Sequence, residues 1–168
     1  PDARPGRMRK IFFFFCGIHP PENKHQSLRA AIRDAGIPPE LVLPLSQHIG
    51  APASPVVAVG DRVLAGQLIA EAPGFVSVPL HAPTSGTVTA IEDRLIAHPS
   101  GLSAPCIVIA TDGLDEWVQH TAAGASYREM NAGELLALIR QAGIAGMGGA
   151  GFPAAVKLVT KPDSKVQT

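Results

Sequence analysis

The sequence predicts a mainly β fold, in which a small barrel or sandwich of short strands is followed by two helices joined by a glycine-rich loop. Between residues 56 and 109, short runs rich in β-branched residues alternate with glycine, proline and aspartate turn signals. After residue 131, apolar residues recur at helical spacing instead. With 168 residues, of which 46% are apolar, the chain is long enough for one domain or two small ones with a core.

The β-rich segment contains several runs with strand character. They lie at residues 56–59, 62–64, 67–71, 75–78, 86–92 and 106–109. Turn formers such as Gly60, Gly66, Pro73 and Pro83 separate them and leave little room for helices. This spacing is typical of a small all-β barrel or sandwich.

The apolar run 11–18 (IFFFFCGI) follows the basic stretch 4–10 and so imitates the start of a secretory signal peptide. The run barely reaches the length of a signal's apolar region, and residues 19–22 (HPPE) supply no small-residue cleavage site. A bilayer span needs about 20 apolar residues. We therefore expect an edge strand or packing against the body of the protein, with no signal peptide and no transmembrane helix.

Two helices are predicted near the end of the chain. Asn131 can cap the first helix while Glu134, three residues later, completes a capping box, and helical spacing of apolar residues continues until Gly143. After the glycine-rich stretch, Pro153 precedes the apolar run 154–158, which can open a second helix with proline in its first turn.

The loop between these helices, residues 143–153 (GIAGMGGAGFP), is rich in glycine. Such a cluster implies positive φ angles or close approach to another surface, and a tight turn between helices would use fewer glycines. Glycines before a helix can present backbone N–H groups to an anion such as phosphate. The loop lacks the Gly-Lys-Ser/Thr of a Walker loop and follows a helix rather than the strand of a Rossmann fingerprint. The alternative is that the glycines only permit close packing of the two helices.

Residues 146–153 with Lys157 resemble the flavin-binding loop of the NADH-oxidising flavoprotein subunit of respiratory complex I. In that family the glycine backbone and the lysine lie against FMN. The resemblance implies four cofactor-binding residues, Gly146, Gly148, Gly149 and Lys157. This chain has Met147 where the family has arginine, and Ala154 where it has threonine. No catalytic residue and no metal ligand is predicted.

Residues 17–24, 43–50 and 59–67 resemble the C subunits of Rnf electron transport complexes, and the resemblance extends from about residue 17 to about residue 161. It implies a membrane-bound complex that couples electron transfer between ferredoxin and NAD to ion translocation. The implied cofactors are FMN and NAD(H), and the implied partners are the other subunits, NADH or NAD and, indirectly, ferredoxin. The implied location is peripheral, at the cytoplasmic face of the bacterial inner membrane.

Rnf C subunits also carry 4Fe–4S clusters in a later domain. Such clusters need four closely spaced thiolates, and this chain has only Cys16 and Cys106, so their ligands are absent from it. The prediction is therefore that the chain is the N-terminal portion of the NADH- and FMN-handling subunit and is inactive by itself.

Residues 59–67 together with 82–88 (APTSGTV) also resemble the barrel-sandwich hybrid fold of biotinyl and lipoyl carrier domains. A carrier must present a lysine on the hairpin between its two halves, and this chain has no lysine between Lys24 and Lys157. The resemblance therefore predicts the fold and disfavours the carrier function. The main alternative role is a non-catalytic docking or assembly module of the complex.

Together these patterns predict four segments. They are an N-terminal segment at 1–25, a barrel-sandwich hybrid β domain at 26–112, a linker at 113–130, and the truncated start of a complex I-type FMN/NADH-binding domain at 131–168.

Several function classes find no support in the sequence. The 14 basic and 14 acidic side chains cancel, which removes the electrostatic case for nucleic-acid binding. The histidines show no paired short spacing, so His48 and His81 are expected to be structural or surface residues rather than metal ligands. Ser85 precedes Gly86 in a predicted β-turn without the Gly-x-Ser-x-Gly elbow of a nucleophilic hydrolase.

Overall fold

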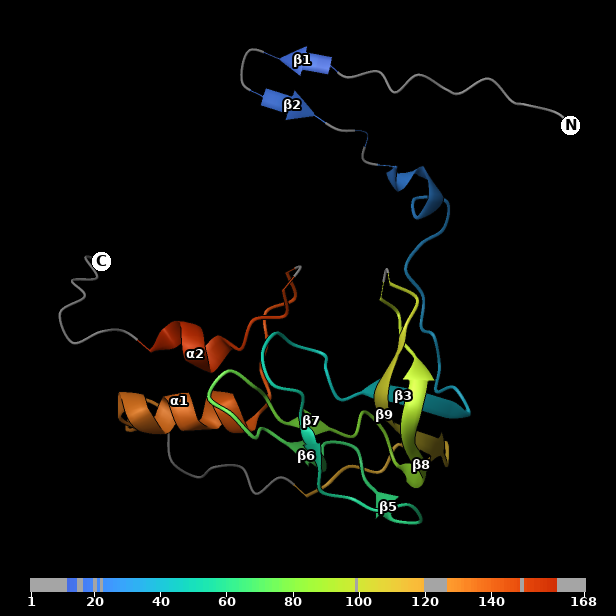
Figure 1. The fold of residues 1–168 in the computed structure, drawn as a ribbon, viewed down its shortest axis with the longest axis vertical. Helices are drawn as coiled ribbons and strands as arrows, with labels where there is room; N and C mark the ends of the chain where they lie inside the picture. Colours follow the sequence, from blue (N-terminus) through green and yellow to red (C-terminus); the bar gives the residue numbers. More distant parts are fainter. Residues whose placement is uncertain are drawn as a thin grey trace, which may run out of the picture. The chain divides into compact units, whose positions relative to one another are not determined.

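A computed structural model of the chain shows two compact units, residues 1–35 and 36–168. The structure describes residues 12–14, 17–19, 21, 23–98, 100–119, 127–148 and 150–159. In the first unit, β1 (Phe12–Phe14) pairs antiparallel with β2 (Gly17–His19), and a short 3-10 helix, η1 (Lys24–Gln26), follows (Figure 1). The apolar run 11–18 was expected to form an edge strand or to pack against the body of the protein, and β1 agrees with the first of these alternatives. The conformation around Cys16 lies outside the described residues.

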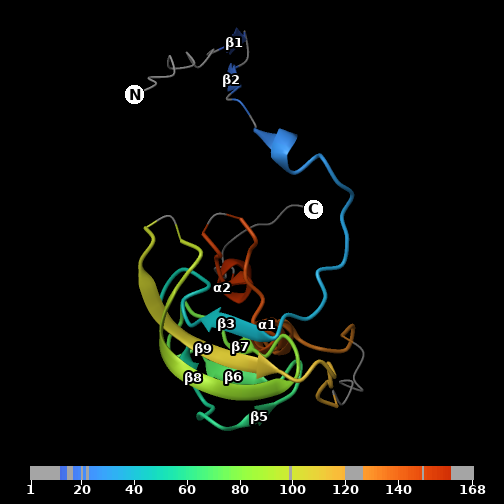
Figure 2. The same ribbon diagram turned by 90° about the vertical axis from the view of Figure 1, so that its right-hand side faces the viewer.

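The second unit contains a β module, residues 40–118, built from two antiparallel sheets. One sheet has the order β3-β9-β8-β5, and the other has the order β4-β6-β7. The strands of the first are β3 (Glu40–Pro44), β5 (Arg62–Val63), β8 (Gly86–Leu95) and β9 (Ser103–Thr111). Those of the second are β4 (Ser54–Pro55), β6 (Leu68–Glu71) and β7 (Leu80–His81). Figure 2 shows β8 and β9 as long curved strands that form most of the first sheet.

The core lies where the two sheets face one another. Its largest buried side chains include Val63, Ile69, Val88, Ile107 and Ile109, none of which is exposed to solvent. They come from both sheets, so neither sheet can bury its apolar face without the other. A shift in register between Val88 and Ala90 is a β-bulge that increases the local bend of β8. The mainly β, barrel-sandwich prediction is confirmed.

Four of the predicted runs are strands, and they correspond to β5, β6, β8 and β9. The run 56–59 is not a strand, because its chain turns: the Ala58 N–H donates to Asp61 Oδ2 at 2.8 Å. The run 75–78 is also not a strand. The Val78 N–H donates to the ring of His48 rather than to a neighbouring strand. Strand β3 was missed, because the prolines before it and at its end conceal its apolar pattern.

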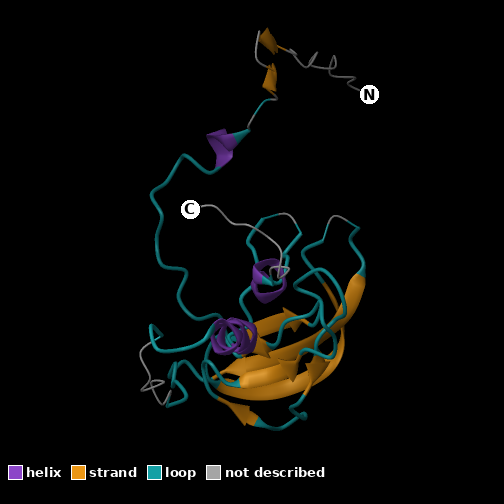
Figure 3. Cartoon of the chain, turned by 90° about the vertical axis from the view of Figure 1, so that its left-hand side faces the viewer, coloured by secondary structure: helices purple, strands orange, loops and turns teal. Residues whose placement is uncertain are grey.

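The helices confirm the signals read from the sequence. Helix α1 (Ala132–Gln141) begins with the predicted capping box, in which Asn131 accepts from the Glu134 N–H and the Glu134 side chain accepts from the Asn131 N–H. It ends before Gly143, which has a φ of 67°. Helix α2 (Ala154–Leu158) packs against α1, and Pro153 is its N-cap rather than a residue of its first turn. Both helices lie at one side of the β module (Figure 3).

The chain that leaves β9 is held on the β module by a polar cluster, which we call the latch: Thr84, Ser85, Asp112, Asp115 and Glu116. The Ser85 hydroxyl donates to Asp112 Oδ1 at 2.6 Å and accepts from the Glu116 N–H at 3.0 Å. The Thr84 hydroxyl donates to Asp115 Oδ1 at 2.8 Å. The first residues of the predicted linker 113–130 therefore contact the β module. Residues 120–126 of that linker lie outside the described part of the chain.

Candidate functional site

The glycine loop, residues 143–153, is a narrow hairpin between α1 and α2. Ala145 and Pro153 pair as an antiparallel bridge, and the Gly146 N–H donates to the Phe152 carbonyl at 2.8 Å. The Gly151 N–H donates to the Gly148 carbonyl at 3.1 Å. These bonds close the base of the hairpin and leave its apex, residues 146–148 and 150 of the described chain, projecting away from the strands (Figures 1 and 2). Gly149 lies outside the described residues.

The two ends of the loop need glycine because of the fold. Gly143 has a φ of 67°, and a Cβ atom placed on it would lie 2.6 Å from the carbonyl oxygen of Pro79. Gly151 has a φ of 53°, and its Cβ would lie 2.9 Å from the carbonyl oxygen of Gln47. Both ends therefore combine a left-handed backbone with direct contact to the β module.

At the apex of the loop, neither the backbone conformation nor the packing requires glycine. A Cβ on Gly148 would meet nothing within 4 Å, and the nearest atom to a Cβ on Gly146 would be the Phe152 carbonyl oxygen at an ordinary 3.6 Å. Neither residue has a positive φ. Glycine is also the residue used where a backbone must come close to a ligand. The packing and the backbone of the described residues therefore do not require glycine at these two positions.

The groups around the apex suit an anion. Among the described residues, hydrogen-bond acceptors are found for the N–H groups of Gly146 and Gly151, but none for those of Met147 and Gly148. The Lys157 ammonium lies 3.8 Å from the position of a Cβ on Gly146 and 5.4 Å from the centroid of the Phe152 ring. The ring face attracts this cation and keeps it beside the loop. The structure thus places Lys157 beside Gly146, and Gly148 lies two residues further along the same exposed apex.

Arg140 contacts the β module next to this loop, and sequence reasoning missed it. Its Nη1 donates to the Phe75 carbonyl at 3.1 Å and its Nη2 donates to the Gly74 carbonyl at 2.5 Å. A basic residue in the last turn of a helix is common, because it interacts favourably with the helix dipole, so Arg140 carried no distinct signal. Its partners are backbone carbonyls 65 and 66 positions away, which no side-chain pattern reveals.

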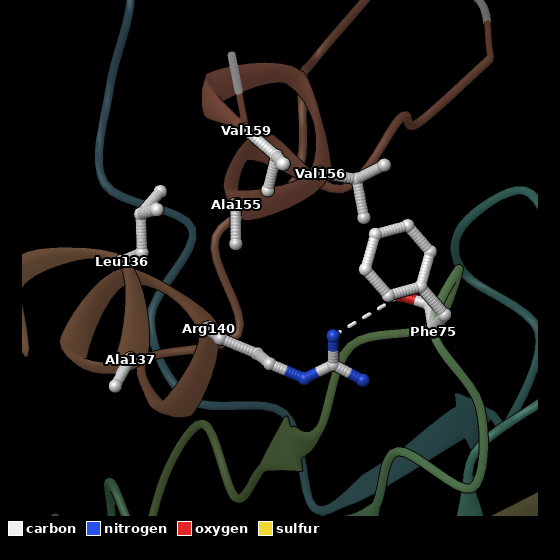
Figure 4. Close-up of a pocket in the computed structure, with 7 residues that line it drawn as sticks. All are labelled: Phe75, Leu136, Ala137, Arg140, Ala155, Val156 and Val159. Atoms are coloured by element: carbon white, nitrogen blue, oxygen red, sulfur yellow. Dashed lines mark hydrogen bonds between the residues drawn. The ribbon is translucent and has the colours of Figure 1, made fainter. Parts of the chain in front are cut away.

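A small apolar hollow lies beside Arg140 (Figure 4). It has a volume of about 140 Å³ and is lined by Phe75, Leu136, Ala137, Arg140, Ala155, Val156 and Val159. Sites for small molecules and cofactors usually have about 300 to 1,000 Å³. The hollow is therefore too small for a flavin.

The histidines singled out in the sequence lie elsewhere. His48 is buried, its Nε2 accepts from the Val78 N–H at 3.3 Å, and its Nδ1 lies 3.1 Å from the Ile49 carbonyl oxygen, which confirms the structural role expected for it. His81 is half-buried at the end of β7 and lines grooves beside α1. Within the described ranges, no three His, Cys, Asp or Glu side chains form a group that could hold a metal ion.

The hairpin between β6 and β7, residues 72–79, corresponds to the place where a carrier domain presents its lysine. Here it contains Gly74 and Phe75, and both of their carbonyls are hydrogen-bonded to Arg140. The hairpin of this chain is thus attached to α1, and it has no lysine to which a cofactor could be joined.

A family model described as the RnfC barrel sandwich hybrid domain matches residues 12–114. The chain belongs to this family. RnfC is the C subunit of the Rnf complexes, so the match confirms the resemblance drawn from residues 17–24, 43–50 and 59–67. The family model ends before α1, so it covers most of the β module but not the glycine loop.

Relatives over nearly the whole chain have names that agree with this family. A Vibrio cholerae serotype O1 protein, named as the C subunit of an ion-translocating oxidoreductase complex, is 54% identical over 149 residues, which are 89% of this chain and 19% of the relative. A Clostridium ljungdahlii protein, named as the C subunit of a proton-translocating ferredoxin:NAD(+) oxidoreductase complex, is 47% identical over 153 residues, 91% of this chain and 33% of the relative. A Pseudomonas aeruginosa protein named like the first is 48% identical over 162 residues, 96% of this chain and 21% of the relative.

The chain thus spans about a fifth to a third of the length of these curated relatives. Among its described helices, none has the length and apolar content that crossing a membrane requires.

Proposed function

We propose that this chain contributes the glycine loop of an FMN site in the C subunit of an Rnf-type complex. That complex would couple electron transfer between NADH or NAD and ferredoxin to ion translocation. The subunit would lie peripherally at the cytoplasmic face of the bacterial inner membrane, bound to the other subunits. The names of the relatives, which include an ion-translocating complex and a ferredoxin:NAD(+) oxidoreductase complex, support this role.

The observation that carries the proposal is the pair of apex glycines, Gly146 and Gly148, for which the fold itself gives no reason. With no side chains in the way, a flavin or its phosphate can approach the backbone there. The N–H groups of Met147 and Gly148 would donate to phosphate oxygens, and the Lys157 ammonium would pair with the same group. Gly149 belongs to the same proposed set by its place in the motif.

The residues present therefore fit the anionic end of FMN. When bound, the flavin supplies the hydride and electron chemistry, while the protein supplies position and electrostatics. Donors at the loop apex would hold the phosphate, and the exposed Met147, at the position of the family's arginine, would leave the apex open.

The isolated chain is expected to bind FMN weakly and not to oxidise NADH. The loop apex is exposed, with Met147 fully accessible to solvent, so it forms one wall of a site rather than an enclosed pocket. Cofactor pockets bury most of their ligand. FMN titration of the chain should therefore show no tight stoichiometric binding.

The proposal is tested in a full-length chimeric subunit, in which this chain replaces the matching segment of the Vibrio cholerae relative. FMN binding is followed by quenching of flavin fluorescence. We expect Gly148→Val and Lys157→Ala each to weaken binding by about tenfold or more, since each removes backbone access or a charge-assisted contact. Lys24→Ala, in the first unit, is the matched control and should bind like the unsubstituted chimera.

Two results would count against the proposal. If the chimera binds FMN and both loop variants bind it equally well, the flavin lies elsewhere in the subunit. If neither the Vibrio cholerae protein nor the chimera binds FMN, the flavin assignment falls, and docking becomes the leading role.

The docking role has support of its own. Trp117 is 60% exposed and Leu138 is 40% exposed, and both line an open groove between α1 and the β module. Exposed aromatic and aliphatic side chains in one groove are typical of surfaces that contact other proteins. Deleting residues 26–112 from the full-length subunit separates the roles. Lost assembly with retained NADH-dye activity would favour docking, whereas lost flavin would favour a part in building the site.

A further inference from the structure

Arg140 attaches the end of α1 to the β module rather than capping its own helix. Its guanidinium donates to two successive carbonyls, those of Gly74 and Phe75, as Figure 4 shows for Phe75. The planar fork of an arginine suits two neighbouring acceptors, and a charged donor makes both bonds strong. The orientation of the last turn of α1 is therefore determined by residues of the β6–β7 hairpin.

The surface that receives Arg140 is one structural element, which we call the seat, residues 47–51 and 74–79. The Val78 N–H donates to His48 Nε2 at 3.3 Å, and the Ala51 N–H donates to the Val76 carbonyl at 3.0 Å. The hydroxyl of the buried Ser77 donates to the Ala51 carbonyl at 2.9 Å. These bonds join the two segments of the seat, so contacts to either segment act on the same support.

The glycine loop meets the seat at both of its ends. Gly143, three residues after Arg140, lies against Pro79, and Gly151 lies against Gln47. The Ile49 N–H donates to the Gly151 carbonyl at 3.4 Å. With Arg140, this makes three attachments to the seat, two before the apex and one after it. The seat therefore determines where the apex lies and which way it faces.

We propose that Arg140 is a positioning residue of the flavin site, which acts by holding the glycine loop on the seat. It would not touch the flavin. Its bonds to Gly74 and Phe75 orient α1, and α1 in turn orients the apex with Gly148 and Lys157 beside it. This inference rests on the proposed function, because it assigns Arg140 to the site that the loop is proposed to form.

The first test measures the loop itself by hydrogen exchange in the 168-residue chain. In Arg140→Ala, amide exchange should rise in residues 143–153 and stay unchanged in β8 and β9, because the core does not depend on this arginine. Arg94→Ala is the matched control, since Arg94 pairs with Glu92 on the β8 strand at 2.7 Å. Faster exchange throughout β8 and β9 would make Arg140 a residue of general stability and would overturn the inference.

The second test measures the flavin in the chimeric subunit. Arg140→Ala should raise the FMN dissociation constant about tenfold, the size expected when charge-assisted bonds that orient a site are lost. At saturating FMN, the visible circular dichroism of the bound flavin should also change, which a loss of stability alone would not cause. Arg140→Lys, which keeps a charged donor, should restore part of the affinity, and Arg94→Ala should match the unsubstituted chimera.

The outcomes separate this inference from the proposed function. If the unsubstituted chimera binds FMN, Gly148→Val weakens binding and Arg140→Ala leaves both affinity and dichroism unchanged, the positioning role is wrong and the flavin site stands. If the unsubstituted chimera and the Vibrio cholerae protein both fail to bind FMN, the proposed function fails, and the positioning role falls with it.

Discussion

The glycine loop has two kinds of glycine, because the fold requires glycine at the ends of the loop but not at its apex. At the ends, Gly143 and Gly151 have positive φ angles and lie against backbone carbonyls of the β module. At the apex, Gly146 and Gly148 have neither feature. A cluster that looks uniform in the sequence therefore contains residues under different physical constraints. The lesson is that each glycine of such a motif must be judged by what a Cβ atom would meet.

The β6–β7 hairpin shows a similar contrast with carrier domains of the same fold. A carrier uses this hairpin to present the lysine to which its cofactor is attached. In this chain the hairpin residues Gly74 and Phe75 instead accept hydrogen bonds from Arg140. The same position in the fold thus becomes a support for the helices that follow.

The largest expected effect is on an end glycine. Gly143→Ala should lower the free energy of unfolding by about 3 kcal/mol, because alanine disfavours a φ of 67° and its Cβ would overlap the Pro79 carbonyl oxygen. Urea unfolding, followed by circular dichroism and by fluorescence of the single Trp117, measures this change. Gly148→Ala is the matched control and should change stability by less than about 0.5 kcal/mol. Equal losses in the two variants would remove the distinction between ends and apex.

The second prediction concerns the latch, the polar cluster that holds the chain after β9 on the β module. Like the end glycines, it should contribute to stability. Ser85→Ala should lower the free energy of unfolding by about 2 kcal/mol, because the buried hydroxyl bonds both Asp112 and the Glu116 N–H. The same urea experiment measures it. Ser103→Ala, at an exposed position on β9, serves as control. A loss of stability no larger than that of the control would show that the latch contributes little.

The smallest expected effect is the response of the latch to acid. Hydrogen bonds from the Ser85 hydroxyl and then the Leu114 N–H hold the pKa of Asp112 below its ordinary value, and Arg62 adds to this. Since the pKa is lower in the folded state, the stabilisation is present above about pH 4, the ordinary value for an unfolded aspartate, and is lost as the pH falls through the folded-state pKa.

Thermal unfolding between pH 7 and pH 3 tests this prediction. Stability should fall less steeply with acid in Ser85→Ala than in the unsubstituted chain, because that variant lacks the bond with the largest effect on Asp112. Parallel pH curves for the two proteins would show that the Ser85–Asp112 bond does not couple stability to pH. No such pH difference is expected between the chain and Gly148→Ala.

Much of the fold could be predicted because its signals are local. The capping box of Asn131 and Glu134 and the stop at Gly143 each depend on residues within a few positions. Strands β5, β6, β8 and β9 were visible as β-branched runs between turn formers. Residues 75–78 were misassigned because Phe-Val-Ser-Val alternates like a strand, although Val78 bonds His48 instead of a neighbouring strand.

The residues of the candidate site could also be read from the sequence. The contacts that hold the glycine loop in place could not. The glycine cluster and Lys157 stand together in the chain, so the motif was visible without coordinates. The contribution of Arg140 was not visible in the sequence, because its hydrogen bonds join positions 65 and 66 residues apart. Its acceptors are backbone carbonyls, which exist at every residue.

The sequence by itself thus determined the helix ends, most strands, the glycine cluster and the absence of a carrier lysine, since these depend on neighbouring residues or on composition. Only the tertiary structure decided which glycines serve the fold, which remain open at the apex, and what holds the loop in place. The physical reason is that the role of a glycine or an arginine depends on the atoms packed around it. Here those atoms belong to segments far away in the chain, the 47–51 and 74–79 parts of the seat.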